Sequence, residues 1–330
     1  MNTETRAPQL APLAAGPKKS VATRNAYGDA LLELGSERED ILVLDADLSG
    51  STKTKAFSKA YPDRFVNLGV AEANMIGTAA GLASQGYTVF ASSFAMFASG
   101  KAWEQVRQSV CVPQLNVKIA ATHAGLTVGE DGKSHQMLED VTLMRVLPYM
   151  KVFVPGDSVE AAECIRVAAR TPGPVYIRLS RANTPVVFDA SYRFEVGKGA
   201  LLRDGADLAI AVNGVVVGPA LEAAELLAAK GIQARVIDLA CVSPIDEALV
   251  IAAARDCGAI LTVEEHQVNG GLGSAVAEVV GEHHPVPIYR HGMRGEFGQS
   301  ATAEVLLAHY GLDGAGIAAK AVELLKRKKR

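Results

Sequence analysis

Glu72 is the one carboxylate in the stretch VNLGVAEANMIG (66–77), where its neighbours are apolar, small or amide residues. The stretch follows a β-branched run and leads into small residues, so we expect Glu72 at the junction of a strand and a helix. An acid in the first turn of a helix is stabilised by the helix dipole by about 0.3 to 1 kcal/mol, which would explain it without any chemistry. The alternative is that this carboxylate acts on a ligand, and both explanations stay open for the residue alone.

Polar and aromatic side chains also follow the other β-branched runs, each where the run ends. In α/β sheets, ligands bind at the carboxyl ends of the strands, where the loops leave the sheet. Singly, these residues have ordinary explanations as ion-pair, loop or core residues; two phenylalanines three positions apart would share a helix face. Their shared place after successive strands favours a binding site made of Glu72 with Asp47, Ser51, Phe94, Phe97, His123, Glu130, Asp131, His135 and Arg181.

The segment GEDGKSHQ (129–136) is the most informative of these loops. Two glycines around paired acids, with a histidine soon after, predict a backbone that bends sharply and brings polar side chains together. The phosphate-binding pattern GxxxxGK[ST] does not occur, which excludes a loop of that kind. In the second half, EEH and GGLG within 264–273 either form an anion site from free N–H groups or pack a helix closely on a sheet.

The elements that would position these residues alternate regularly along the chain. β-branched runs separated by helical stretches predict an α/β fold of two domains, each a mainly parallel sheet with helices on both faces. The alternation lapses over 188–207, so we expect a flexible arm over 1–20, one domain over 21–190 and a second over 191–330. The expected strands are 41–45, 65–69, 87–92, 117–122, 151–155 and 175–179, then 208–214, 234–239, 259–265 and 286–290.

Composition excludes several classes of protein. With 49% hydrophobic and 21% charged residues in 330, the chain is typical of a globular protein without a membrane span or signal peptide, so we expect it in the cytoplasm. Its 33 basic and 36 acidic residues are well mixed, which disfavours nucleic-acid binding. The four cysteines are far apart and none is in a CxxC pair, so we expect buried thiols and neither disulfides nor a zinc site. They are Cys111, Cys164, Cys241 and Cys257.

The sequence resembles the C-terminal half of transketolase, a thiamine diphosphate enzyme, from about Val21 to the end. The resemblance implies a pyrimidine-binding domain followed by the family's C-terminal domain. It also implies reversible transfer of a two-carbon ketol unit from a ketose phosphate to an aldose phosphate. The matching stretches are ATRNAYGDAL (22–31), DADLSGS (45–51), GVAEANM (69–75), SSFAMF (92–97), THAGLTVGEDGKSHQ (122–136), RLSRAN (178–183) and EFGQSATAEVLLAHYGL (296–312).

The resemblance assigns four residues to the cofactor. The Glu72 carboxyl group would hydrogen-bond the pyrimidine ring nitrogen and so promote loss of the C2 proton from the thiazolium. An apolar shell would strengthen that hydrogen bond, which accounts for its setting. Phe94 and Phe97 match the aromatic platform on which the pyrimidine stacks, and Asp47 matches an acid near the cofactor and the subunit interface.

The resemblance assigns the remaining residues to the substrate. His135 matches a histidine near the reacting carbon that transfers protons, and Asp131 matches an acid that binds a substrate hydroxyl. The cluster that would grip a sugar phosphate suits a dianion, because it combines guanidinium, hydroxyl and imidazole groups. Its members are Arg24, Ser51, His123 and Arg181.

The family holds Mg²⁺ and the diphosphate with a GDG motif followed by an asparagine, and no GDG occurs here. The resemblance therefore implies a split transketolase whose N-terminal subunit binds the diphosphate and the Mg²⁺, with no metal ligands on this chain. Because the family builds its sites between two protomers, we expect a heterotetramer with two copies of each chain.

Departures from the family pattern leave other enzymes open. Ala71 replaces a common arginine, as in 1-deoxy-D-xylulose-5-phosphate synthase or 2-oxo acid dehydrogenase beta subunits, and Lys133 and Ser134 replace a common proline and threonine. His123 and the acid pair after Gly129 favour transketolase over the synthase, and the phosphate-gripping cluster favours it over the dehydrogenases. A non-catalytic scaffolding subunit is a further alternative, which the retained site residues disfavour.

Overall fold

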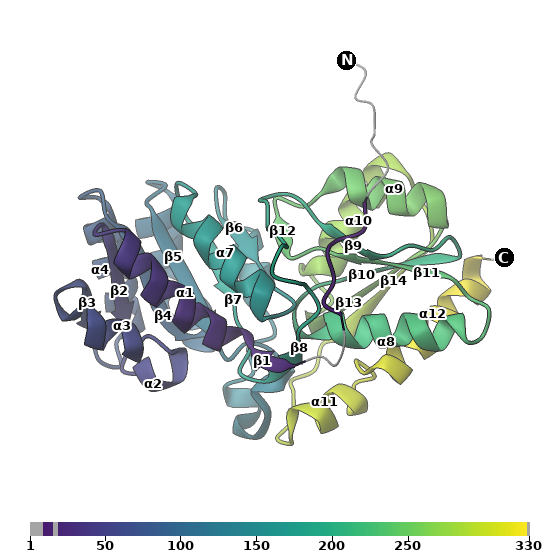
Figure 1. Cartoon of the computed structure of the whole chain (residues 1–330), viewed down its shortest axis with the longest axis horizontal. Coiled ribbons are helices and arrows are strands. Elements are labelled where there is room, and N and C mark those ends of the chain that lie inside the picture. Colours follow the sequence, from purple (N-terminus) through teal and green to yellow (C-terminus); the bar gives the residue numbers. More distant parts are fainter. Residues whose placement is uncertain (1–8, 16–18, 329–330) are drawn as a thin grey trace, which may run out of the picture.

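The computed structural model describes residues 9–15 and 19–328 and shows two α/β domains side by side (Figure 1). Each domain has its own mainly parallel sheet, which confirms the fold class expected from the sequence. Every β-branched run that predicts a strand holds one, because buried parallel strands are nearly continuous in Val, Ile and Ala. Within the described residues, no helix combines the length and the apolar character that crossing a membrane requires.

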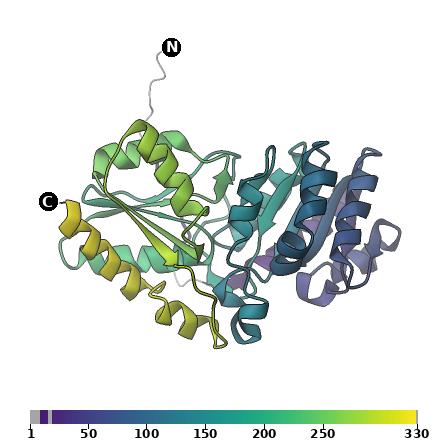
Figure 2. The same ribbon diagram turned by 180° about the vertical axis from the view of Figure 1, so that it is seen from behind.

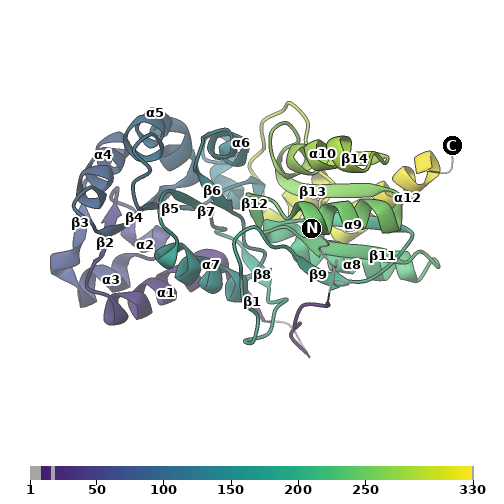
Figure 3. The ribbon, with the colours of Figure 1, turned by 90° about the horizontal axis from the view of Figure 1, so that it is seen from above.

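The first domain contains a seven-stranded sheet in the order β12-β6-β7-β5-β4-β2-β3, parallel except where β12 meets β6. Figure 3 shows α1, α3 and α7 on one face and α4, α5 and α6 on the other; Figure 2 gives the view from behind. The strands are β2 (Ile41–Asp45), β3 (Phe65–Asn67), β4 (Thr88–Phe94), β5 (Val117–Thr122), β6 (Lys151–Phe153) and β7 (Val175–Arg178). The helices are α1 (Thr23–Glu37), α2 (Ser49–Thr52), α3 (Lys55–Ala60), α4 (Glu72–Ala83), α5 (Trp103–Gln105), α6 (Asp140–Arg145) and α7 (Ser158–Arg170).

Shorter helical turns complete the first domain, and two of them have the wider π-helical winding. These are η2 (Met96–Lys101) and η3 (Val106–Cys111), on either side of α5. The 3₁₀ turns are η1 (Pro62–Arg64) and η4 (Leu126–Ser134). A π turn inserts a residue into a helix and is frequent at functional sites, so η2 bears directly on the site below.

The second domain contains a five-stranded sheet in the order β14-β13-β10-β11-β9, with β9 antiparallel to β11. α8 and α12 lie on one face, α9 and α10 on the other (Figure 1). The strands are β9 (Ala200–Arg203), β10 (Leu208–Val212), β11 (Ala234–Asp238), β13 (Ile260–Gln267) and β14 (Ile288–Met293). The helices are η5 (Gly214–Val216), α8 (Val217–Ala228), α9 (Glu247–Cys257), α10 (Leu272–His283), α11 (Ala303–His309) and α12 (Gly314–Lys328).

Two short strand pairings join segments far apart in the chain, and the sequence did not predict them. Strand β12 (Cys241–Ser243) follows the second domain's β11 but extends the first domain's sheet by pairing with β6. Near the start of the chain, β1 (Ser20–Ala22) pairs with β8 (Asn183–Pro185). These strands have only three residues each, too few for a period to be visible in the sequence.

The described part of the predicted flexible arm, residues 9–15, lies against the molecule. The N–H of Ala11 donates to the carbonyl of Leu201 over 2.8 Å, and the N–H of Ala14 donates to the carbonyl of Val187 over 2.9 Å. An exposed edge strand offers unpaired backbone groups, and here β9 pairs with the arm. Residues 9–15 of the expected arm therefore make backbone contacts with residues 187 and 201; residues 1–8 and 16–18 lie outside the described residues.

Candidate active site

Glu72 begins helix α4, as expected at the junction of a strand and a helix. The preceding loop turns through Gly69, whose φ of 67° lies in the left-handed region that favours glycine. The helix cap, Ala71, makes no side-chain hydrogen bond, so the free N–H groups and dipole of the first turn favour the Glu72 carboxylate. The side chain is 2% exposed, and a carboxylate so buried needs a partner.

That partner is Lys101, a residue that the sequence analysis missed. Its Nζ lies 2.6 Å from Oε2 of Glu72, and its side chain is 54% exposed. Lys101 closes the π-helical turn η2, where the N–H of Ala102 donates to the carbonyl of Phe97 over 3.1 Å. No residue type marks a π turn, so the side of the helix on which Lys101 lies could not be read from the sequence.

The expected aromatic pair is present, but it is not on one helix face. Phe94 is the last residue of β4, and Phe97 lies in the π turn that follows. Their ring centroids are 6.1 Å apart at 17° between planes, and the His123 ring stacks on Phe94 at 3.8 Å. Phe94 is buried and Phe97 is half-buried, so Phe97 offers the more accessible ring. His135 stands edge-on to Phe97 at 5.6 Å, which brings these four rings together.

His123 is held as a neutral imidazole. Burial first, and then the charges of Arg24 and Arg181, lower its pKa to about 3. Its Nε2 lies 3.0 Å from a guanidinium nitrogen of Arg24, which can only donate, so Nε2 accepts. Nδ1 therefore carries the proton and donates to the hydroxyl of Thr122 over 2.9 Å. The left-handed backbone of His123, with φ of 55°, turns the ring toward this cluster.

Arg24 joins the predicted anion-binding residues to the rings. It donates to the backbone carbonyl of Ser51 over 3.1 Å. Its buried Nε has no hydrogen-bond partner among the described residues, and burial, followed by the charge of Arg181, lowers its pKa. A half-buried cation with a free buried donor and a second cation nearby would be stabilised by an anion.

Arg181 contacts the loop after β5. One of its guanidinium nitrogens donates to the carbonyl of Val128 and lies 3.4 Å from Glu130 and 3.7 Å from Asp131. The loop bends sharply, as GEDGKSHQ predicts, at Gly129 and Gly132 with φ of 84° and 71°. Asp131 thus faces an arginine here, whereas the resemblance places Asp131 on a substrate hydroxyl and Arg181 on a phosphate.

Asp47 makes no hydrogen bond or ion pair with the rings or the arginines among the described residues. It lies exposed in the loop after β2, and its N–H and carboxylate pair with the side chain of Asn67 over 3.0 and 3.1 Å. The same amide oxygen accepts from the N–H of Gly69. Asp47 therefore braces the loop that leads to Glu72.

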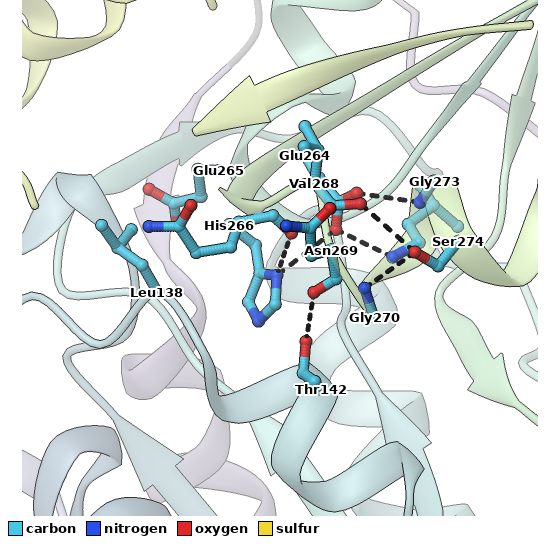
Figure 4. A network of polar contacts seen from close by, with 12 residues as sticks. Leu138, Thr142, Glu264, Glu265, His266, Val268, Asn269, Gly270, Gly273 and Ser274 are labelled. Atoms are coloured by element: carbon cyan, nitrogen blue, oxygen red, sulfur yellow. Dashed lines mark hydrogen bonds and ion pairs between the residues drawn. The ribbon is translucent and has the colours of Figure 1, made fainter. Parts of the chain in front are cut away.

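The anion site that GGLG could form at the start of α10 is already filled. The Glu264 carboxylate accepts from the N–H groups of Leu272 and Gly273, both over 2.8 Å (Figure 4). A Cβ at Gly271 would come within 2.1 Å of that carboxylate, so a larger residue there would displace the Glu264 side chain. The alternative of close packing is correct, with the second domain's own acid as the anion.

A buried group of ion pairs around Arg178, close to Glu264 in the sequence through Glu265, connects the two domains. Arg178, at the end of β7, pairs with Asp140 over 2.9 Å and with Glu265 of the second domain over 3.3 Å. All three side chains are nearly or completely buried.

Among residues 9–15 and 19–328, no cluster of His, Cys, Asp and Glu could hold a metal, and the four cysteines are free and buried.

Two family models match the chain. The transketolase pyrimidine-binding domain matches residues 19–187, and the transketolase C-terminal domain matches residues 197–317. The fold and the site thus define a two-domain α/β protein with a pyrimidine-binding domain first. The chain belongs to the transketolase family, a family of thiamine diphosphate-dependent transferases.

Relatives of similar length match over nearly their whole extent. A protein of Methanocaldococcus jannaschii described as "Putative transketolase C-terminal section" is 50% identical over 307 residues, 92% of this chain and 96% of the relative. The 6-deoxy-6-sulfo-D-fructose transketolase subunit SqwH of a Clostridium species is 42% identical over 305 residues, with coverage of 92% and 95%. A solved split gene transketolase, described as an inactive beta4 tetramer, superposes with a TM-score of 0.88 at 52% identity, with coverage of 93% and 99%.

Proposed function

We propose that this chain is the C-terminal subunit of a split transketolase, which transfers a two-carbon ketol unit reversibly from a ketose phosphate to an aldose phosphate. The observation that carries the proposal is the Glu72 carboxylate, 2% exposed at the start of α4 and in contact with the turn that holds Phe97. A buried acid in contact with a turn that also carries an aromatic ring suits a planar base with a ring nitrogen. A subunit that only supports a partner would need neither feature.

The residues present fit the pyrimidine end of thiamine diphosphate. Glu72 would hydrogen-bond the ring nitrogen, and Phe97 would offer its face for stacking, while Phe94 supports His123. When bound, the cofactor would supply a carbon nucleophile that also accepts the electron pair of the cleaved bond. His135, edge-on to Phe97, would move a proton at the substrate.

The cationic residues fit the anionic end of a sugar phosphate. Arg24, with its unpartnered Nε, and Arg181 would bind the phosphate oxygens, and His123, protonated at Nδ1, keeps Nε2 as an acceptor toward Arg24. Asp131 lies near Arg181 and could turn from it to a substrate hydroxyl. The same cluster suits a sulfonate, the anionic group in the name of the Clostridium relative.

A separate subunit would complete the enzyme. The described part of this chain holds no metal cluster, and the relatives that it covers almost fully are named as a section, a subunit or a split-gene product. We place the Mg²⁺ and diphosphate ligands on an N-terminal transketolase subunit and expect two copies of each chain in a heterotetramer.

The test is co-purification with that subunit, followed by a donor screen. The complex should use xylulose 5-phosphate in preference to pyruvate, and the chain alone should be inactive and bind thiamine diphosphate weakly. Activity of the chain alone would refute the split enzyme. Preference for pyruvate would favour the synthase-like or dehydrogenase-like alternative, and no turnover of any donor by a well-formed complex would favour the scaffold.

A further inference from the structure

The ion pair between Lys101 and Glu72 joins a solvated group to a buried one. The Lys101 side chain is 54% exposed and that of Glu72 is 2% exposed, with 2.6 Å between Nζ and Oε2. Among the described residues, this contact is the one hydrogen bond that the Glu72 side chain makes. The carboxylate that is expected to bind the cofactor is thus already paired with a cationic side chain of the same chain.

The π turn η2 explains how the lysine reaches this carboxylate. Phe97 and Lys101 lie in the same six-residue segment, so the proposed ring platform and the cation on Glu72 are parts of one structural unit. The next residues are anchored separately, because the indole N–H of Trp103 donates to the carbonyl of Leu143 over 2.9 Å. The residues after the turn are therefore held, while the Lys101 side chain as a whole is 54% exposed.

A lysine in this setting is readily displaced. Moving Nζ away breaks one charge-assisted hydrogen bond and leaves the ammonium in water, where it is well solvated. The same movement leaves the Glu72 carboxylate buried without a partner unless another donor replaces the ammonium. A protonated ring nitrogen that arrives at Oε2 would be such a donor.

We propose that Lys101 is a displaceable cap on Glu72, which neutralises the carboxylate in the empty subunit and gives way when the pyrimidine of the cofactor binds. The inference rests on the proposed function, since it takes Glu72 as the residue that meets the pyrimidine nitrogen. Lys101 then competes with the cofactor for one carboxylate. Removing the lysine side chain's charge should consequently tighten cofactor binding, whereas loss of a residue that merely supports the fold would weaken it.

The test is isothermal titration calorimetry of thiamine diphosphate, in the presence of Mg²⁺, into the complex of this chain with its partner subunit. A partly exposed ion pair contributes up to about 1 kcal/mol, so the dissociation constant of Lys101→Met should fall about fivefold. Lys101→Arg, which keeps the charge, and Arg107→Met, which removes an exposed cation from the neighbouring turn η3, should each stay within about twofold of wild type. Lys101→Gln provides a second neutral variant if Lys101→Met has a much lower melting temperature than wild type.

A double-mutant cycle separates this inference from the proposed function. In a Glu72→Ala background, Lys101→Met should no longer change the dissociation constant, because the residue that it caps is gone. If the neutral Lys101 variants bind the cofactor no more tightly than wild type while Glu72→Ala abolishes transfer, the role of Lys101 as a cap is overturned and the proposed function stands. Normal binding and normal transfer by Glu72→Ala would overturn the proposed function itself.

Discussion

A guanidinium nitrogen of Arg24 donates to Nε2 of His123 over 3.0 Å, so a half-buried arginine is held against a neutral imidazole and not against a carboxylate. Because the imidazole of His123 is neutral, it accepts a hydrogen bond from Arg24 but does not neutralise the positive charge of the guanidinium. Neither Arg24 nor His123 forms an ion pair among the described residues. A site organised in this way is prepared for an anion from outside the chain.

Arg24→Met in the assembled enzyme should weaken binding of the phosphorylated donor. A charge-assisted hydrogen bond contributes about 1.5 to 3 kcal/mol, so KM should rise about 10- to 100-fold. The change in kcat should be much smaller, since the proposed function assigns Arg24 to the phosphate and not to the reacting carbon. Steady-state kinetics with xylulose 5-phosphate and with an unphosphorylated ketose provide the comparison. Equal losses for both donors would show that Arg24 does not bind the phosphate.

Arg178→Met should destabilise the junction of the two domains. The change leaves Asp140 and Glu265 buried without their cation, and such a loss costs about 3 to 5 kcal/mol of unfolding free energy. The matched control is Arg166→Met, which removes partly exposed pairs with Glu33 and Glu163 and should cost less than about 1 kcal/mol. Urea unfolding followed by far-UV circular dichroism measures both. A loss below about 1 kcal/mol for Arg178→Met would contradict this account of the interface.

The acids Glu160 and Asp238 should make stability fall as pH rises. They lie on α7 and β11, and Glu160 accepts from the hydroxyl of Tyr192 over 2.6 Å. Burial raises the pKa of Glu160 to about 7, and burial and the charge of Glu160 raise that of Asp238. The folded state therefore binds more protons than the unfolded state, where Glu160 has its ordinary pKa of 4.5. Stability is highest below that value and is lost as pH rises toward 7.

Asp238→Asn tests this assignment, because it keeps the shape of the side chain and removes one of the two charges. Between pH 5 and 8, the decline in unfolding free energy should be at least about 1 kcal/mol smaller for the variant, since one pKa unit corresponds to about 1.4 kcal/mol. Urea midpoints at several pH values give the comparison. Parallel pH profiles for wild type and variant would place the titrating group elsewhere.

Much of the fold was predictable, because buried parallel strands and the helices between them leave strong local patterns. Glu72 was placed correctly at a strand-to-helix junction from its neighbours alone, and the bend of GEDGKSHQ followed from its glycines. The arrangement around Phe94 was not predictable: β4 extends to Phe94 and the turn after it is π-helical, which moves Phe97 off the expected face and brings Lys101 to Glu72.

Contacts between distant segments were equally hidden from the sequence. β12 joins the sheet of the other domain, and the carboxylate of Glu264 fills the helix start that could have bound an external anion. Such pairings depend on where the whole chain brings two segments together, and no local residue pattern encodes them. For the same reason the contact of Asp131 with Arg181 came only from the structure.

The most direct measurement of the central claim, that this chain supplies the activating acid of a shared cofactor site, is the transfer rate of Glu72→Ala in the assembled two-chain enzyme. Proton-transfer catalysis contributes about 100- to 10,000-fold, so the rate should fall at least about 100-fold while assembly and thermal melting stay near wild type. Glu104→Ala, which removes an exposed acid near the same π turns, should keep nearly full activity. Near-normal transfer by Glu72→Ala would contradict the claim.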